Sequence, residues 1–310
     1  MLPTPHPKPW QVSLILAMGI LAVSTAAVFV RLSLAAAETQ GVGFSLFLAA
    51  SRMAITALIL LPVWRSVAQS RPSRSSLGYA AAAGVLLAVH FAFWITSLSY
   101  TSIVASTTLV TTNPIWVALI SWIWFGEKMS WQRAIGIGIA LSGSLLVGLG
   151  DAGGDAGSAP ILGDFLALAG AWAVSLYFLL GREAQRRGLG TTQYITVAYS
   201  TAAIVLLPLP GIFQTPYEGY PGAVYGYVLL MAIVPQLIGH TSFNWAVRWV
   251  SPTLVTLTIL FEPVFASLLG YFLFREVPKP LVLVGAGVIL AGVAIAVLGS
   301  RVEKVSDPER

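Results

Sequence analysis

Polar side chains that could bind a solute or carry a proton lie within long apolar stretches of this chain. In one stretch Gln236, His240 and Asn244 are spaced four residues apart, so on a regular helix they share one face. In an earlier stretch His90 is followed four residues later by Trp94. A polar stripe of this kind lines a cavity or forms hydrogen bonds to a neighbouring helix. We favour the cavity and keep interhelical bonding as the alternative. Two histidines without clustered carboxylates do not predict a metal site.

Two charged residues, Arg52 and Glu262, also lie deep in apolar sequence. A charge at the centre of a membrane costs roughly 2.5–3.5 kcal/mol, so each needs a partner or a function. Two polar residues in matching segments stand directly before a proline, giving Asn113-Pro114 and Glu262-Pro263. Proline kinks a helix and frees a carbonyl group, so both dipeptides predict gating kinks. For the Glu262 carboxylate, three alternatives stay open: a charge pair with Arg52, proton coupling, or neither.

Aromatic residues occur inside these stretches as well as at their ends. Those inside include Trp172 and Tyr177, with Phe91, Tyr199, Phe243 and Trp245. Any single ring is better explained by packing than by ligand contact. As a group, with a few polar residues among them, they favour a cavity for flat and mostly apolar solutes.

The elements that must position these residues are membrane-spanning helices. The chain is 57% hydrophobic and 9% charged, whereas soluble domains carry about 25% charged residues. Apolar runs of about 20 residues predict helices that cross a bilayer. Ten such runs are expected, at 11–31, 42–64, 77–99, 102–124, 132–150, 161–181, 191–209, 223–246, 252–274 and 280–299. The predicted fold class is an all-α integral membrane protein.

The chain also contains a duplication. Residues 102–150 align without a gap with residues 251–299, at an offset of 149 (299 − 150). The matched residues include Pro114 with Pro263, Glu127 with Glu276, and Gly136, Gly138, Gly143 and Gly150 with Gly285, Gly287, Gly292 and Gly299. We expect these glycines to allow close helix packing, and each of the two glutamates to cap the helix that follows it or to hold a loop.

Each half of the chain holds five predicted spans, residues 1–150 and 160–300, before a tail at 301–310. Because five is odd, the second half must enter the bilayer from the opposite side, which predicts an inverted repeat. With both termini inside, 13 of the 17 lysines and arginines fall on the inner side and three on the outer side. The positive-inside rule therefore predicts cytoplasmic termini.

The pattern of proline, Gly-Glu and following glycines resembles the EamA family of the drug/metabolite transporter superfamily. It occurs as Pro114, Gly126-Glu127, Gly136 and Gly143, and again as Glu262-Pro263, Arg275-Glu276, Gly285 and Gly292. Arg275 departs from the pattern, because glycine would precede the glutamate there. The segment around Arg52 also looks like the second span of that family. Members with this layout include YddG-type exporters of aromatic amino acids.

The resemblance implies a secondary transporter of a bacterial-type inner membrane that exports small organic solutes, aromatic amino acids or related amphipathic metabolites above all, by alternating access around a central cavity. Its expected partners are a small-molecule substrate and the lipid bilayer, with no nucleic acid and no cofactor, and it is expected to work as a monomer. One alternative is efflux of drugs or cationic compounds, which would favour an unpaired Glu262 in the cavity. Others are a channel and a membrane-embedded enzyme on lipid substrates. No Walker-type loop or catalytic constellation is found in the sequence.

Overall fold

The computed structural model describes residues 7–125, 129–151, 158–246 and 258–306, together with Trp249 and Val255. Within these residues the chain is helical and contains no strand. The first half comprises α1 (Pro9–Ser24), α2 (Ala26–Ala37), α3 (Val42–Ile59), a 3₁₀ turn η1 (Leu61–Val63), α4 (Trp64–Ser70), α5 (Arg74–Ser97), α6 (Ile103–Val110), α7 (Asn113–Phe125) and α8 (Trp131–Asp151). The second half comprises α9 (Pro160–Arg186), α10 (Thr191–Leu206), α11 (Leu209–Ile212), α12 (Gly222–Met231), a π-helix η2 (Ala232–His240), α13 (Thr241–Ala246), α15 (Glu262–Phe274) and α16 (Pro280–Ser306).

Eight helical segments are long and apolar enough to cross a membrane. They are Pro9–Ala37, Val42–Ile59, Arg74–Ser97, Ile103–Ile120, Trp131–Gly150, Pro160–Arg186, Thr191–Ile212 and Gly222–Ala246. Two shorter apolar helices, Glu262–Phe274 and Pro280–Ala296, overlap the last two predicted spans. The all-helical, multi-pass class is therefore confirmed. The count of ten stays a prediction, because much of the stretch before α15 lies outside the described residues.

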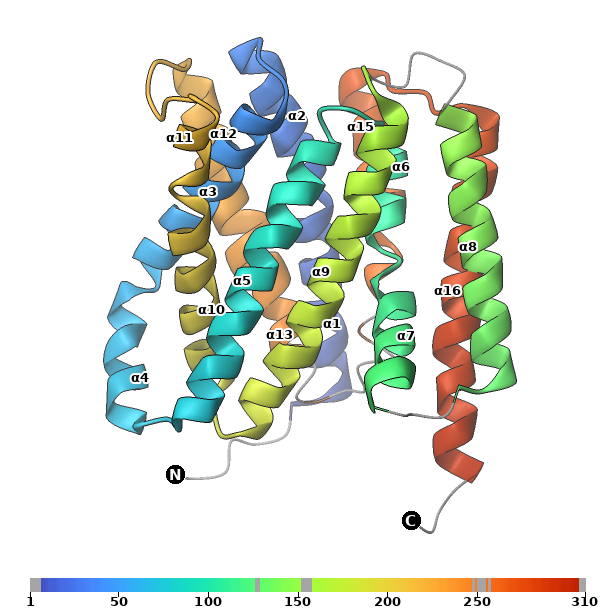
Figure 1. The fold of residues 1–310 in the computed structure, drawn as a ribbon, viewed down its shortest axis with the longest axis horizontal. Coiled ribbons are helices and arrows are strands. Elements are labelled where there is room, and N and C mark those ends of the chain that lie inside the picture. Colours follow the sequence, from blue (N-terminus) through green and yellow to red (C-terminus); the bar gives the residue numbers. More distant parts are fainter. Residues whose placement is uncertain are drawn as a thin grey trace.

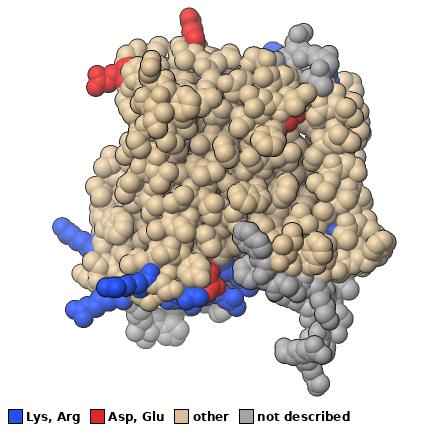
Figure 2. Space-filling model, in the orientation of Figure 1, with Lys and Arg blue, Asp and Glu red and all other residues tan. Residues whose placement is uncertain are grey.

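The helices lie side by side and run between two ends of the molecule (Figure 1). The start of α1, helix α4 and the end of α16 lie at one end, whereas the loop between α2 and α3 and helix α11 lie at the other (Figure 1). On the face shown in Figure 2, most Lys and Arg side chains gather at the end that carries α4. A broad uncharged band separates the two ends, as a membrane-spanning protein requires.

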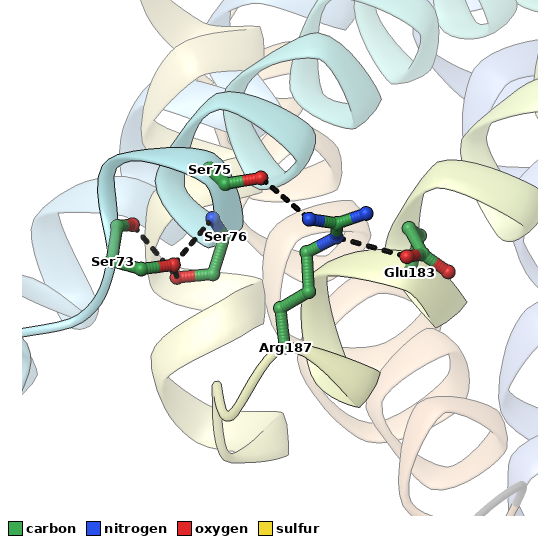
Figure 3. A network of polar contacts seen from close by, with 5 residues as sticks. All are labelled: Ser73, Ser75, Ser76, Glu183 and Arg187. Carbon is green, nitrogen blue, oxygen red and sulfur yellow. Dashed lines mark hydrogen bonds and ion pairs between the residues drawn. The ribbon is translucent and has the colours of Figure 1, made fainter.

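Short polar contacts at this basic end fix the start of α5 against the end of α9. The hydroxyl of Ser73 accepts a hydrogen bond from the Ser76 backbone N–H at 3.1 Å and so caps α5. Arg187, directly after the last residue of α9, donates from Nε to Glu183 and from Nη1 to Ser75, both at 2.9 Å. Figure 3 shows the guanidinium of Arg187 between these two partners. The contact holds together the two helices that form one wall of the cavity described below.

The repeated glycines bring α8 and α16 into backbone contact, as the sequence predicts. A Cβ atom on Gly136 would lie 2.6 Å from the carbonyl oxygen of Gly292, and one on Gly143 would lie 2.8 Å from that of Gly285. Both distances are too short for any side chain larger than hydrogen. Because the higher-numbered residue of α8 meets the lower-numbered residue of α16, the two helices are antiparallel.

The backbone explains why the repeat pattern has glycine at position 275, although this chain carries Arg275 there. Arg275 ends α15 with a φ of 55°, the left-handed conformation that glycine adopts without strain. The next residue, Glu276, accepts a hydrogen bond from the Ile103 backbone N–H at 2.6 Å, so it caps α6 rather than the helix that follows it. Its partner Glu127, with Gly126, lies outside the described residues.

Candidate functional site

A pocket lies among the helices of both halves, with a cavity volume of about 50 Å³. Its apolar wall is formed by Val23, Ala26, Trp94, Val110, Val174, Phe178, Phe243 and Ile259. Its polar lining is formed by His90, Thr111, Asn113, His240 and Glu262. Five predicted site residues therefore meet in one cavity: His90, Trp94, Asn113, His240 and Glu262. These residues come from four elements, α5 (His90 and Trp94), α7, η2 and α15, and folding brings them together.

The imidazole of His90 is fixed by helix α9. Its Nδ1 lies 2.9 Å from the carbonyl oxygen of Gly170, and because a carbonyl only accepts, Nδ1 must carry the proton. The ring is parallel to that of Trp94, with centroids 6.1 Å apart. Among the described residues Nε2 has no hydrogen-bond partner, so this atom is free to accept a bond from a bound solute.

Asn113 and Glu262 each begin a helix after a break. Thr111 and Thr112 form a turn between α6 and α7, and Leu260 and Phe261 form a turn before α15. The kinks that the two prolines predict are thus present, although their role in gating stays a prediction. Each break places a polar side chain at a cavity wall, since half-helix ends expose polar groups that a continuous helix would satisfy.

Arg52 is bonded to Gln236 and not to Glu262, so the charge pair that was one of the three alternatives for Glu262 is not formed among the described residues. Arg52 is fully buried and donates from Nη2 to Oε1 of Gln236 at 2.7 Å. Its guanidinium carbon also lies 4.2 Å from the centre of the Phe91 ring. No ion pair joins Arg52 to Glu262 in the described part of the chain. The Glu262 carboxylate is half-buried at the cavity and has no hydrogen-bond or ionic partner among the described residues.

The expected polar stripe does not stay on one face. Pro235 lies inside the helix, where it cannot donate a backbone hydrogen bond, and the turns from Ala232 to His240 are π-helical. His240 therefore lies at the cavity, whereas Gln236 is buried beside Arg52. Asn244 bonds instead to the hydroxyl groups of two tyrosines, Tyr177 at 3.2 Å and Tyr199 at 3.4 Å.

Two predicted aromatic residues do not line the cavity. Tyr177 is buried in the cluster with Asn244, and Trp172 is 42% exposed on the outer surface of α9. The reason for Trp172 is that it lies on the side of α9 that points away from the cavity. Val174 and Phe178, four residues apart, face the cavity, and a residue two positions before Val174 must face away from it. Phe178 is thus the aromatic contact that the sequence did not single out.

A signal in the sequence relates many of the cavity residues to one another. Three pairs share the offset of 149 between the halves: Val110 with Ile259 (259 − 110), Asn113 with Glu262 (262 − 113) and Trp94 with Phe243 (243 − 94). A fourth pair, Val23 with Val174, differs by 151 (174 − 23), as Gly19 and Gly170 do (170 − 19). Once Trp94 and Asn113 are taken as site residues, this offset points to Phe243 as well as Glu262. The cavity therefore draws equivalent positions from both halves.

Comparison with known proteins decides the family. The model of the EamA-like transporter family matches this chain over residues 10–149 and again over residues 161–298. The chain belongs to the EamA-like transporter family. As a member of this family with apolar helices of membrane-spanning length, it is a multi-pass membrane protein that transports small solutes.

Curated relatives of this EamA-like chain are named as transporters. A "Probable terminal-alkyne amino-acid exporter" of Streptantibioticus cattleyicolor is 28% identical over 65% of this chain and 67% of its own length. "Uncharacterized transporter YyaM" of Bacillus subtilis is 23% identical over 82% of this chain and 83% of its own length. A protein crystal structure with 22% identity superposes over 96% of this chain and all of its own, with a TM-score of 0.61. That likeness shows a shared fold.

Proposed function

We propose that this EamA-like protein is a ten-helix secondary transporter built from two inverted halves, residues 1–150 and 160–300. The observation that carries the architecture is a contact made twice. A Cβ atom on Gly19 would lie 3.1 Å from Phe243, and a Cβ atom on Gly170 would lie 3.4 Å from Trp94. The first residues differ by 151 (170 − 19) and the second by 149 (243 − 94). The first span of each half therefore packs on the third span of the other half, and this reciprocal contact supports a two-fold relation between the halves, as an inverted repeat requires.

An inverted repeat supplies a transport cycle. If each half can adopt the conformation of the other, one state opens the cavity to one side and its counterpart opens it to the opposite side. The breaks before Asn113 and Glu262 lie at the cavity wall, where such a rearrangement would act. Lys and Arg side chains gather at the end of the molecule where α1 starts and α16 ends (Figure 2). This distribution supports cytoplasmic termini in a bacterial inner membrane. Because one chain supplies every wall, a monomer suffices.

The chemistry of the cavity favours a solute with an amino group and an apolar side chain. Glu262 offers a carboxylate that no arginine, lysine or other described residue neutralises, so it can bind an ammonium group. Trp94, Phe178 and Phe243 surround this polar lining with aromatic rings. Aromatic amino acids combine both features, and the relative named as an amino-acid exporter agrees with this substrate class. We therefore propose export of aromatic amino acids or related amphipathic metabolites.

Efflux of cationic compounds is the second candidate. It is favoured by one observation, the unpaired Glu262 in a cavity whose described lining includes no basic residue other than histidine. A cationic drug and the ammonium of an amino acid would use the same carboxylate. The two candidates differ in whether the solute must also carry an anionic group.

Counterflow in proteoliposomes tests the proposal. Vesicles loaded with phenylalanine, tyrosine or tryptophan should accumulate the labelled amino acid from outside, and vesicles loaded with an organic cation should not. Glu262→Gln should abolish the exchange, whereas Glu218→Gln, at an exposed loop position, should leave it unchanged. Exchange of organic cations alone would establish the second candidate, and exchange of neither class would exclude both substrates.

A further inference from the structure

The cavity does not use the most deeply buried charge of the molecule. Arg52 has no exposed surface, and of its guanidinium nitrogens only Nη2 has a hydrogen bond. Its Nε and Nη1 atoms are buried without a partner, and so is Nε2 of Gln236, the residue to which it is bonded. Three unsatisfied donor nitrogens thus lie on two side chains in direct contact. Buried donors are almost always satisfied in folded proteins, so a missing acceptor is indicated.

No described carboxylate can be that acceptor. The one acidic group near the centre of the helix bundle, Glu262, faces the cavity and has no ion pair with Arg52. The ring of Phe91 lies 4.2 Å from the guanidinium carbon, but a ring stabilises the face of a guanidinium rather than its edge. The N–H groups on the edge still require oxygen atoms or an anion.

The donors define the ligand chemistry. The unpartnered Nε and Nη1 atoms of Arg52 can each donate to an oxygen atom of an anion, and the amide of Gln236 adds a third donor. A halide ion can accept the same bonds. From this geometry we propose that Arg52 and Gln236 form a buried binding site for a small monovalent anion, taken up either as the carboxylate of the transported solute or as an inorganic ion such as chloride.

The position of the site links it to the cavity. Phe91 covers Arg52 on one side and meets the ring of His240 edge to face, with centroids 5.8 Å apart. His240 itself lines the cavity. The side chain of Phe91 therefore lies between Arg52 and a residue of the cavity wall. Occupation by the solute rests on the proposed amino-acid transport, whereas occupation by chloride does not depend on it.

Thermal unfolding of the purified protein in detergent distinguishes the two sources at constant ionic strength. In sodium isethionate, whose bulky anion does not fit a buried site, added chloride should raise the unfolding temperature and saturate if an inorganic ion binds. If the carboxylate of the solute binds, added phenylalanine should raise the unfolding temperature. Phenylalanine amide, which lacks the carboxylate, should not raise it. Arg52→Gln should remove whichever response the unmodified protein shows, whereas Arg187→Gln, at a surface arginine, should keep it.

Two further variants keep the proposal testable if the Arg52→Gln protein does not fold. Gln236→Leu retains the charge of Arg52 but removes both the amide donor and the oxygen that accepts from Nη2, so it should weaken the anion response by about tenfold. Glu262→Gln should keep the response to chloride, even if it abolishes amino-acid exchange. The proposal is wrong if neither anion changes the unfolding temperature of the unmodified protein, or if folded Arg52→Gln or Gln236→Leu responds as the unmodified protein does.

Discussion

The rings of Phe91 and His240 meet at right angles with their centroids 5.8 Å apart. Their numbers differ by 149 (240 − 91), the offset that relates Pro114 to Pro263. Two equivalent residues of a duplicated protein can touch only close to the axis that relates the copies. Under the proposed inverted repeat, the axis therefore passes between α5 and η2, beside the cavity and beside Arg52.

Replacing Phe91 by alanine should damage the centre of the molecule. The ring is fully buried between Arg52 and His240, and loss of a buried phenylalanine costs about 3–5 kcal/mol of unfolding free energy. Phe93 is the matched control, because it lies on the same helix and is 37% exposed. Thermal unfolding in detergent would measure both variants. Equal losses would contradict the central position assigned to Phe91.

Trp94→Ala should impair exchange more than Trp172→Ala. The Trp94 side chain lines the cavity and is 4% exposed, whereas Trp172 is 42% exposed on the outer face of α9. We expect the first variant to lower counterflow about tenfold, which corresponds to about 1.4 kcal/mol of lost interaction. Initial rates of labelled phenylalanine uptake, corrected for the amount of reconstituted protein, provide the measurement. A larger effect of Trp172→Ala would place the solute elsewhere.

Much of the architecture could be predicted from the sequence, because each feature rests on a local property. Apolar length predicts the membrane-spanning helices, and the spacing of Gly136 and Gly143 predicts a close helix contact. A proline after a polar residue predicts the breaks at Asn113 and Glu262. These inferences need only the identity and spacing of neighbouring residues, and in the described residues each feature is present.

The direction of individual side chains could not be predicted in the same way. Whether Trp172 or Phe178 faces the cavity depends on the rotation of α9 about its axis, which packing against α5 decides. Gln236 leaves the stripe because Pro235 and the π-helical turns change the angle between successive residues. The partner of Arg52 likewise depends on how α3 meets η2, and sequence alone leaves that choice open.

Adding one methyl group to Gly136 should separate α8 from α16. The new Cβ atom would meet the backbone of α16 at 2.6 Å from the Gly292 carbonyl oxygen, so the helices must shift. Overpacking of this kind costs about 1–3 kcal/mol. Gly138→Ala is the control, since a Cβ atom there meets nothing within 4 Å and alanine favours the helix. Unfolding temperatures of the two variants should therefore move in opposite directions, and a loss of equal size in both would contradict the glycine contact.

The proposed orientation predicts which loops a reagent can reach from outside the cell. The chain contains no cysteine, so a single introduced thiol reports on one position without background. Thr39→Cys, in the exposed loop between α2 and α3, should react with a membrane-impermeant maleimide in intact cells. Ser70→Cys, exposed at the basic end, should react only after the membrane is permeabilised. Because the two positions lie at opposite ends of the bundle (Figure 1), labelling of Ser70→Cys alone in intact cells would show an orientation opposite to the proposed one.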